Sequence, residues 1–396
     1  MASVQLNFVR IARKEIIKVK ILMINSVCGI RSTGRICTDL AQELEAQGHE
    51  VKIAYGRAES VPEQFRKYAV RIGNNLDLYF HAFCTRLLDN HGFGSGRATK
   101  EFLKWADAYT PDLLWLHNIH GYYINIELLF QWIKGRPQMK VIWTFHDCWA
   151  FTGHCAYFTV AKCEKWRTGC QDCPQKNRYP ASLLLDRSRQ NYLQKRALFT
   201  GVRDMTLIMP SKWLANLVKQ SFLNEYPAEV CYNTINTEVF KPTPSNFREQ
   251  WGLKNKRIIL GVASEWGDCK GFPDFLRLSE MLDSSYVIVL VGLRDAQIRK
   301  LRRNMIGIRR TDNASELAQI YSAADVFFNP TYEDNYPTVN LEAQACGIPV
   351  VTYASGGAAE TIYSKNSVAV PTGNLKEGMR ILTDICKIHS DTPLCD

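Results

Sequence analysis

The sequence lacks an uninterrupted apolar run long enough to cross a membrane. A spanning helix needs about 18 or more consecutive apolar residues, and no such run occurs in the 396 residues. The first 20 residues mix charged with apolar side chains, without the continuous apolar core and small-residue cleavage site of a signal peptide. These absences predict a cytoplasmic protein whose thirteen cysteines are mostly reduced.

The sequence also lacks repeats of solenoid period and low-complexity tracts, which excludes repeat architectures and long disordered segments. Its composition, 46% hydrophobic and 22% charged, is typical of a soluble globular protein. A chain of this length accommodates two domains of about 150–200 residues.

Positive charge is concentrated in the first half of the chain. Residues 1–200 hold 28 Lys and Arg against 17 Asp and Glu, whereas residues 201–396 hold 21 against 22. Basic surfaces attract nucleic acid, anionic lipid head groups or sugar phosphates. The alternative is a solvated basic face with no partner.

Strands and helices are predicted to alternate along the chain. An apolar strand at residues 19–25 precedes a glycine-containing loop, a helix at 35–47 and a strand at 51–55, which together form the first unit of a Rossmann-like domain. Further strands are predicted at residues 113–117, 141–145, 206–209, 257–263, 286–291, 326–329 and 350–353, and helices at 126–134, 182–201, 211–223, 272–282, 315–323 and 338–346. The pattern predicts an α/β protein with a parallel sheet in each half.

A proline-containing stretch without periodicity, residues 236–246, marks the domain boundary. We expect an N-terminal extension at residues 1–18, an N-terminal domain at 19–235 with a cysteine-rich insertion at 148–180, and a C-terminal domain at 236–396.

Charged residues of the second half fall where a parallel sheet binds ligands, beyond the carboxyl ends of its strands. Lys270 follows a strand and precedes Gly271 and a helix, so it can meet a diphosphate. Asp334 lies in the loop before a later helix and Glu342 within that helix; carboxylates there can accept hydrogen bonds from vicinal sugar hydroxyls. The alternatives are a surface lysine and a solvated helix face.

The run around these acids resembles a known signature. Residues 342–350 read EAQACGIPV, and Asp334 precedes them. This is similar to the signature of retaining glycosyltransferases of family 4, which have the GT-B fold: two Rossmann-like domains that face each other across a cleft. The likeness includes SKWL at residues 211–214, NTIN at 233–236 and ADV at 324–326.

The resemblance implies roles for individual residues. Glu342 would bind the ribose of a nucleotide sugar, Asp334 its sugar and Lys270 its diphosphate, while the backbone amides of residues 335–338 would line the sugar and its phosphate. The implied catalytic residues are His146, Lys270 and Asp334, and the implied donor-binding residues are Gly34, Lys270, Glu333, Asp334, Asn335, Tyr336, Pro337, Thr338 and Glu342.

Two positions depart from the family pattern. The first acid is usually Glu, but Asp334 stands there with Glu333 beside it, so either acid could do the work. The family also has an Arg five residues before the diphosphate Lys, where this chain has Glu265. The candidates to replace that cation are Arg294, Arg309 and Arg310.

The N-terminal half supplies further candidates at strand ends. Gly34 is expected at the start of the first helix, where a side chain would keep a phosphate from the amides. His146 follows a buried strand, although a single histidine is more often structural, and in related enzymes the matching His contacts the donor sugar. His117, His120 and Gly121 are expected to shape an acceptor pocket.

Five cysteines fall within residues 148–173. Cys170 and Cys173 have zinc-knuckle spacing, and Cys155 and Cys163 complete a tetrahedral set, with His154 as a spare ligand. The alternatives are reduced packing cysteines and a disulfide. If zinc binds, we expect it to be structural, and we expect catalysis to need no cofactor.

The resemblance implies retaining transfer of a hexose from a nucleotide-sugar donor to a saccharide acceptor, carried on a lipid, in cell-surface polysaccharide synthesis, with peripheral contact at the inner membrane. The alternatives are another GT-B enzyme, a sugar-nucleotide epimerase or phosphorylase, or a nucleic-acid-binding protein that uses the basic half and the cysteine knuckle. Base-stacking aromatics are not interleaved with Lys and Arg, so we expect no nucleic-acid partner.

Overall fold

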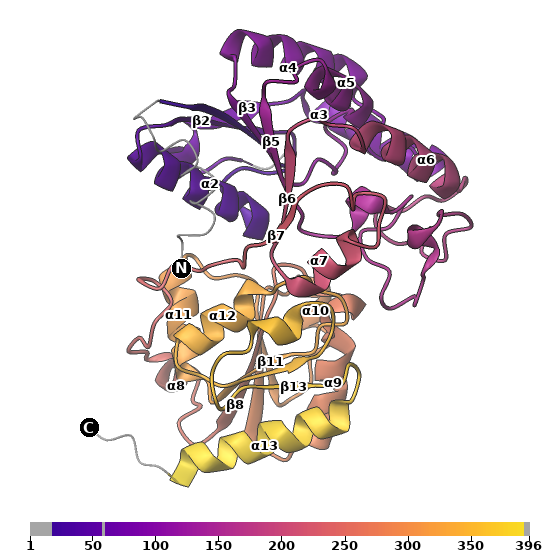
Figure 1. Cartoon of the computed structure of the whole chain (residues 1–396). Helices are drawn as coiled ribbons and strands as arrows, with labels where there is room; N and C mark the ends of the chain where they lie inside the picture. Colours follow the sequence, from indigo (N-terminus) through magenta and orange to yellow (C-terminus); the bar gives the residue numbers. More distant parts are fainter. Residues whose placement is uncertain (1–17, 58–59, 392–396) are drawn as a thin grey trace. The chain divides into compact units, whose positions relative to one another are not determined.

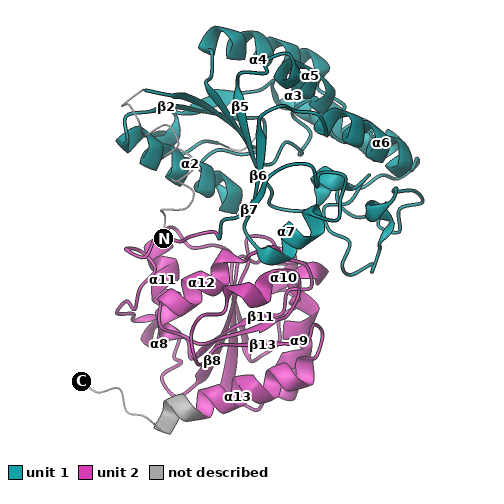
Figure 2. Ribbon diagram, in the orientation of Figure 1, with its two compact units in different colours: residues 1–232 teal, residues 233–396 magenta. Residues whose placement is uncertain are grey.

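The computed structural model describes residues 18–57 and 60–391 and divides the chain into two compact units (Figures 1 and 2). Unit 1 is Met1–Tyr232 and unit 2 is Asn233–Asp396. The segment that follows the division is part of unit 2, because Phe240 is buried there and packs against Tyr321. The expected boundary at residues 235/236 lies three residues further along the chain.

Unit 1 is built on a seven-stranded sheet in the order β3-β2-β1-β4-β5-β6-β7, and all neighbouring strands pair in parallel. The strand order reverses between β1 and β4, which makes the β1/β4 edge a topological switch point of the Rossmann type. The strands are β1 (Lys20–Ile24), β2 (Glu50–Tyr55), β3 (Ala69–Arg71), β4 (Leu113–Leu116), β5 (Lys140–Thr144), β6 (Met205–Met209) and β7 (Ala228–Val230).

Helices cover both faces of this sheet. Ile21 and Met23 of β1 share a buried cluster with α2, whereas Leu22 and Ile24 share another with α4 and α5. Figure 1 shows α2 on one side of the strands and α4 and α5 on the other. Burial on both faces explains why β1 is continuously apolar from Ile21 to Ile24 rather than alternating. The helices are α2 (Arg31–Ala46), α3 (Asn75–Leu88), α4 (Gly96–Tyr109), α5 (Ile126–Lys134), α6 (Ser188–Phe199) and α7 (Lys212–Val218), with short 3-10 turns η1 (Glu63–Phe65), η2 (Trp149–Phe151) and η3 (Lys165–Arg167).

Unit 2 repeats this architecture with six parallel strands in the order β10-β9-β8-β11-β12-β13. The order reverses between β8 and β11. Its strands are β8 (Arg257–Val262), β9 (Tyr286–Val291), β10 (Met305–Ile308), β11 (Val326–Asn329), β12 (Val350–Tyr353) and β13 (Val368–Val370). Its helices are α8 (Phe247–Gln250), α9 (Phe272–Met281), α10 (Asp295–Ile298), α11 (Ala314–Ala323), α12 (Thr338–Ala345) and α13 (Leu375–Asp391), with turns η4 (Asp268–Lys270) and η5 (Ala358–Thr361).

Alternate residues of the central strands separate two cores in unit 2. Leu260 of β8 packs in a cluster with α11 and α12, whereas Ile259 packs in a second cluster with α9 and α13. The sheet is therefore buried on both faces, and its polar chemistry is confined to the loops at the strand ends.

Several boundaries differ from the sequence prediction. The helix predicted at residues 182–201 begins only at Ser188, because Leu183 and Leu185 donate backbone hydrogen bonds to the carbonyls of Arg86 and Leu87 and so lie alongside the end of α3. The helix predicted to run to residue 223 ends at Val218.

The predicted N-cap of α7 is confirmed. The Ser211 hydroxyl accepts a hydrogen bond of 3.1 Å from the Leu214 amide.

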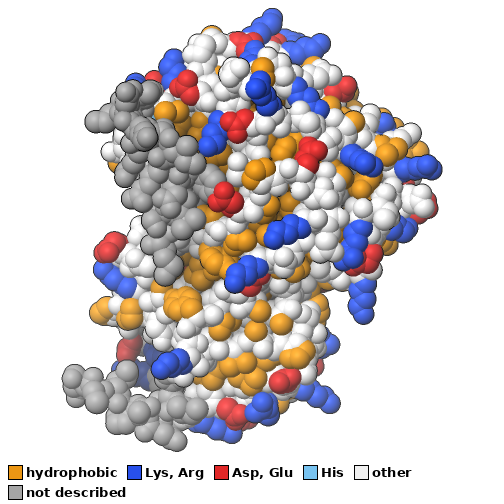
Figure 3. Space-filling model, viewed as in Figure 1, with side chains coloured by type: hydrophobic (Ala, Val, Ile, Leu, Met, Phe, Trp, Pro, Cys, Tyr) orange, Lys and Arg blue, Asp and Glu red, His pale blue; other side chains and the backbone are white. Residues whose placement is uncertain are grey.

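Surface charge and helix length bear on the expected partners. On the face that Figure 3 shows, basic and acidic side chains are interspersed over both units, so the basic excess of the N-terminal half forms no continuous patch on that face. Within the described residues, no helix is both long enough and apolar enough to span a bilayer.

Candidate functional site

Three loops meet at the carboxyl edge of the unit 2 sheet. They follow β8, β11 and β12, which are neighbours in the strand order. The Tyr332 amide donates a hydrogen bond of 2.8 Å to the Cys269 carbonyl, and the Gly357 amide donates one of 3.2 Å to the Asp334 carbonyl. Parallel strands send their carboxyl ends to one edge, so segments far apart in sequence converge here.

Lys270 and Asp334 form an ion pair within this loop cluster. The Lys270 Nζ lies 2.5 Å from Asp334 Oδ2, and 36% of the lysine side chain and 17% of the aspartate side chain are exposed. The neighbouring acid, Glu333, is buried, and its carboxylate accepts a hydrogen bond of 3.5 Å from the Cys269 thiol. Both acids therefore contact the η4 turn, and Asp334 is the one paired with the predicted diphosphate lysine.

Two glycines allow these loops to approach closely. Gly271 has φ +71°, and a Cβ there would lie 2.3 Å from the Pro330 carbonyl oxygen. Gly356 has φ +55°, and a Cβ there would lie 1.9 Å from the Asp334 carbonyl oxygen. Only glycine satisfies both conditions. Sequence analysis missed Gly356, although a Gly-Gly pair soon after an apolar strand was an available signal.

Glu342 lies on α12 and is 4% exposed. The Tyr321 hydroxyl, which comes from α11, donates a hydrogen bond of 3.1 Å to Glu342 Oε2 and so fixes the carboxylate. Sequence analysis did not find Tyr321, because it looks like an ordinary apolar-face residue of its helix. A buried carboxylate held by a hydroxyl is arranged to accept further hydrogen bonds.

The loop between Asp334 and α12 supplies fewer amides than predicted. The Asn335 amide donates a hydrogen bond of 3.0 Å to Asp334 Oδ1. Pro337 has no N–H and cannot donate at all, so its inclusion among the amide donors was wrong. The amides of Tyr336 and Thr338 complete the predicted set.

Three arginines are candidates to replace the cation that the family has at the position of Glu265. Arg294 forms an ion pair with Glu265, and Arg309 forms one with Asp295. Arg310 is exposed and makes no ion pair among the described residues. Of the three candidates, Arg294 places its guanidinium directly at Glu265.

Histidines gather at the carboxyl ends of β4 and β5 in unit 1. Nδ1 of His117 lies 3.1 Å from Nε2 of His146, with the rings stacked. His120 Nε2 lies 2.9 Å from Asp147 Oδ2, and its Nδ1 lies 3.0 Å from the Tyr179 hydroxyl. The structure thus brings together the predicted histidines after these two strands, and it adds Tyr179.

The imidazoles of His117 and His146 are uncharged at neutral pH. Burial lowers the pKa of His146 to about 4, although the charge of Asp147 opposes the shift. Burial also lowers the pKa of His81 to about 4 and that of His117 well below its ordinary value. At pH 7 the neutral His146 ring can therefore donate one hydrogen bond and accept another, but it is not an imidazolium that could act as a general acid.

Gly34 is the fourth residue of α2 rather than a residue ahead of it. A Cβ there would lie 3.0 Å from Val27 Cγ2 and 3.2 Å from the Gly29 amide nitrogen. The glycine thus lets the β1–α2 loop pack on the first turn of its own helix. Gly34 and His146 belong to unit 1, and the other predicted donor-binding and catalytic residues belong to unit 2.

No cysteine of the insertion forms a disulfide. Cys155, Cys163, Cys170 and Cys173 line one small cavity in unit 1. Among the described residues, no group of three or more His, Cys, Asp or Glu side chains is placed so that it could hold a metal ion.

Comparison with known families identifies this architecture. A family model for Glycosyltransferase Family 4 matches residues 33–239, just over half of the chain. The chain belongs to glycosyltransferase family 4. A second model, Glycosyl transferases group 1, matches residues 256–386 of the same glycosyltransferase and so covers most of unit 2.

Similar proteins cover nearly the full length of this family 4 glycosyltransferase. An Escherichia coli (strain K12) protein assigned to colanic acid biosynthesis as glycosyl transferase WcaC is 24% identical over 355 residues, which are 85% of this chain and 83% of that protein. Sucrose-phosphate synthase from Thermosynechococcus elongatus has a TM-score of 0.69 at 16% identity and covers 93% of this chain and 90% of its own. Anabaena HepE in complex with UDP has a TM-score of 0.63 at 15% identity and covers 94% and 91%. These structures establish the GT-B fold with two Rossmann-like domains.

We expect the glycosyltransferase to lose stability as the pH falls from 6.5 towards 4. The buried histidines have folded-state pKa values below their ordinary 6.5, so the unfolded chain binds more protons in this window and stability present above pH 6.5 is lost below it. For His81 and His146 the loss at pH 5 is up to about 2 kcal/mol each. Urea unfolding at pH 7 and pH 5 measures it, and His81→Gln should flatten the dependence. Equal stability at both pH values contradicts the burial argument.

Proposed function

We propose that this glycosyltransferase moves a hexose from a nucleotide-sugar donor, bound by unit 2, to a saccharide acceptor, with retention of the anomeric configuration. The observation that carries the proposal is the loop cluster of unit 2, where the Lys270–Asp334 ion pair lies at the carboxyl edge of the sheet. The α12 helix, with the buried Glu342, follows the same loop.

The donor would be held by complementary groups along its length. Glu342, fixed by Tyr321, accepts hydrogen bonds from the ribose hydroxyls. Lys270 neutralises the diphosphate, and this frees Asp334 from its ion pair to accept a hydrogen bond from the sugar. HepE, which has a similar fold, was solved in complex with UDP and in complex with UDP-glucose.

Arg294 is the cation that we assign to the place of the missing family arginine. Its guanidinium is tethered by Glu265 beside the η4 turn and is largely exposed. A diphosphate competes with a single exposed carboxylate for this guanidinium at little cost, because exposed ion pairs contribute at most about 1 kcal/mol. The charge lost at Glu265 would thus be restored from the neighbouring strand end.

The transfer needs no metal in this scheme. The bond between the anomeric carbon and the diphosphate oxygen breaks, a bond to the acceptor oxygen forms on the same face, and the acceptor proton passes to the departing phosphate. The protein contributes electrostatic stabilisation of the leaving group by Lys270 and the loop amides. His146, the other catalytic residue that the family resemblance implies, is uncharged and can take part in hydrogen bonds.

The acceptor side is assigned to unit 1, which exposes apolar side chains at one place. Leu76, Tyr79, Phe80 and Phe83 lie on one face of α3 and are each 58–78% exposed. Leu183, Leu184 and Leu185, also exposed, continue this surface, because their backbone is hydrogen-bonded to the end of α3. We call these seven residues the α3 surface.

A lipid bilayer is the occupant that suits the α3 surface. Exposed Arg86, Arg178 and Arg189 lie on or near these same segments, as an anionic membrane would require. Aromatic and leucine side chains flanked by arginine are typical of peripheral membrane contact. A lipid-linked saccharide acceptor at the inner membrane would then lie within reach of unit 1.

Cell-surface polysaccharide synthesis is the process that we assign to this transfer. The support is the long match to the Escherichia coli protein of colanic acid biosynthesis, which spans both units.

The first test is a thermal-shift screen of nucleotide sugars. One or more should raise the melting temperature of the wild-type protein, and Glu342→Ala should weaken the affinity for that donor roughly ten- to a hundred-fold, since a charged hydrogen-bond acceptor is lost. Glu280→Ala is the matched control, because Glu280 forms an exposed ion pair on α9. Unchanged donor affinity in Glu342→Ala refutes the ribose assignment, and a screen without any hit refutes the function.

Lys270→Ala should lower kcat about a hundred-fold or more and affect donor affinity less, because its charge is needed most when the diphosphate departs. Rates of sugar transfer and donor Kd measure the two effects separately. Lys254→Ala, which removes another exposed lysine of unit 2, should change neither. An equal loss in kcat for both variants would contradict the assignment.

The α3 surface is tested with vesicles. Wild-type protein should co-sediment with anionic vesicles more than with zwitterionic ones, and Phe80→Asp should weaken that binding about tenfold or more. Tyr363→Asp is the control, because Tyr363 is 62% exposed on unit 2. The lipid assignment is overturned if the wild-type protein does not bind vesicles. It is also overturned if the wild type sediments as a dimer and Phe80→Asp makes it monomeric.

A further inference from the structure

Four thiols of the cysteine-rich insertion line a single cavity. Cys155, Cys163, Cys170 and Cys173 come from separate turns of a segment without regular helices or strands between β5 and α6. The cavity has a volume of about 10 Å³. That is room for about one atom-sized species and excludes an organic ligand.

The thiols already interact across this cavity. The side chains of Cys155 and Cys173 are hydrogen-bonded to each other, and the Gly153 amide donates a hydrogen bond of 3.2 Å to Cys170 Sγ. Backbone N–H groups that point at sulfur stabilise thiolate charge. None of the four cysteines is in a disulfide.

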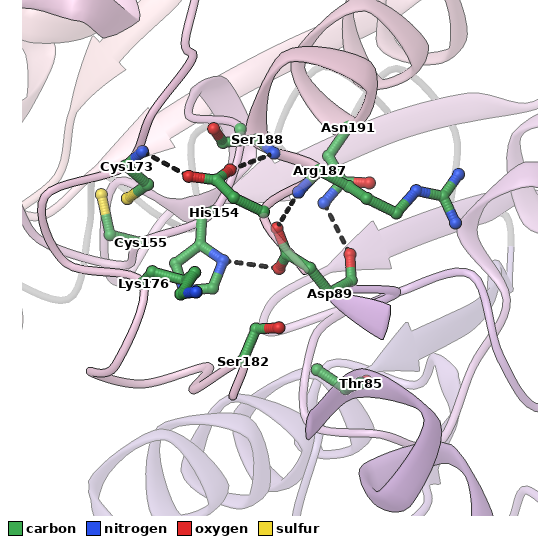
Figure 4. Close-up of polar contacts among 12 residues, drawn as sticks. Thr85, Asp89, His154, Cys155, Cys173, Lys176, Ser182, Arg187, Ser188 and Asn191 are labelled. Atoms are coloured by element: carbon green, nitrogen blue, oxygen red, sulfur yellow. Dashed lines mark hydrogen bonds and ion pairs between the residues drawn. The ribbon is translucent and has the colours of Figure 1, made fainter. Parts of the chain in front are cut away.

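A buried histidine borders the same cavity with one ring nitrogen unused. His154 is 2% exposed, and its Nδ1 lies 2.6 Å from Asp89 Oδ1. Its Nε2 is buried without any hydrogen-bond partner in the structure. Figure 4 shows His154 between Asp89 on one side and Cys155 and Cys173 on the other. A buried orphan nitrogen is costly and indicates an absent partner at this position.

A buried lysine lies close to the cysteines of the cavity. Lys195 is 1% exposed, and its ammonium donates to the carbonyls of Trp149 at 2.8 Å and Thr152 at 3.1 Å. No carboxylate of the described residues lies within ion-pair distance of it, and the groups whose charge favours its protonated form are Cys170, Cys155, Asp89 and Asp147. A buried cation needs a nearby negative charge.

We infer that this cavity is a structural zinc site in which Cys155, Cys163, Cys170 and Cys173 bind one Zn²⁺ through their sulfur atoms. Four thiolates complete a tetrahedral site and leave no position for a substrate. The centre carries two net negative charges, which face the ammonium of Lys195. Asp89 holds the His154 ring through Nδ1, and Nε2 of His154 would form a hydrogen bond to one of the zinc-bound thiolates without binding the metal itself.

Binding requires the sulfur atoms to move, because in the described residues no three His, Cys, Asp or Glu side chains are placed so that they could hold a metal ion. The four thiol protons are released as the metal binds.

The zinc would hold the insertion against the rest of unit 1. Asp89, at the end of α3, accepts hydrogen bonds from the Arg187 amide through Oδ2 and from the Asn191 side chain through its carbonyl (Figure 4). The insertion begins directly after His146 and Asp147. A fixed insertion therefore fixes the chain beside the histidines of unit 1, and loss of zinc should loosen both.

The test measures metal in reduced, full-length protein purified without chelator. We expect inductively coupled plasma mass spectrometry to find about one zinc per chain. The Cys170→Ser and Cys173→Ser variants should lose most of this zinc. Cys84→Ser is the matched control, because Cys84 is a half-buried cysteine of unit 1 outside the cavity. Wild-type protein that contains no zinc and binds none on titration overturns the inference, as does a Cys155–Cys173 disulfide found by thiol counting.

The ligand set is tested by comparing two variants. Cys163→Ser should weaken zinc binding, His154→Gln should retain one zinc per chain, and the Co²⁺-loaded wild type should show a tetrathiolate absorption spectrum. Zinc lost from His154→Gln but kept by Cys163→Ser refutes the four-thiolate set.

If the serine variants do not fold, the zinc site is tested on the wild-type protein alone. Removal of metal with a chelator should lower its melting temperature, and Zn²⁺ should restore it. A chelator without effect on a zinc-containing protein's metal content and stability contradicts a site of this kind. The result is independent of the sugar-transfer proposal, because donor binding is measured on unit 2.

Discussion

A parallel sheet that is buried on both faces leaves few places for polar side chains, and this constraint organises both halves of the protein. The central strands β1 and β8 carry no polar side chain after their first residue, because helices cover each side. Backbone polarity and charged groups therefore gather in the loops beyond the strand ends. In unit 2 those loops hold Lys270 and Asp334, and in unit 1 they hold His117 and His146.

The carboxyl edges of the two sheets differ in how their ionisable side chains are accommodated. The loops of unit 2 are partly exposed, so opposite charges can stand in pairs that an incoming anion can exchange, as with Lys270–Asp334 and Arg294–Glu265. The edge of unit 1 is more buried, and desolvation keeps its His117 and His146 uncharged. A charged donor suits the first environment, and an uncharged saccharide hydroxyl suits the second.

The cysteine-rich insertion is where unit 1 departs most from a plain Rossmann-like domain. It contributes few regular hydrogen bonds, and its interior consists of packed aromatic rings, including Phe151, Phe158 and Trp166. Around this small aromatic core the chain buries the Lys195 ammonium and the Nε2 atom of His154, which has no hydrogen-bond partner there. A metal–thiolate centre would reconcile the polar groups with the burial.

The sequence by itself determined the strongly apolar and periodic elements. The strands at residues 286–291, 326–329 and 350–353 and the helix at 126–134 were predicted with the bounds that the structure has. The family motif also singled out Lys270, Asp334 and Glu342 as candidate site residues, and the structure brings Lys270 and Asp334 together in an ion pair.

Only the tertiary structure decided the short outer strands, such as β3 and β13, whose three residues become strands by pairing with a neighbour. It also decided the partners of the site residues: Tyr321 for Glu342, Gly356 for Asp334 and Asp89 for His154. Those residues lie about 20 or more positions apart in the chain. Periodicity and spacing report contacts within one element, whereas these contacts form only when separate strands deliver their ends to the same edge.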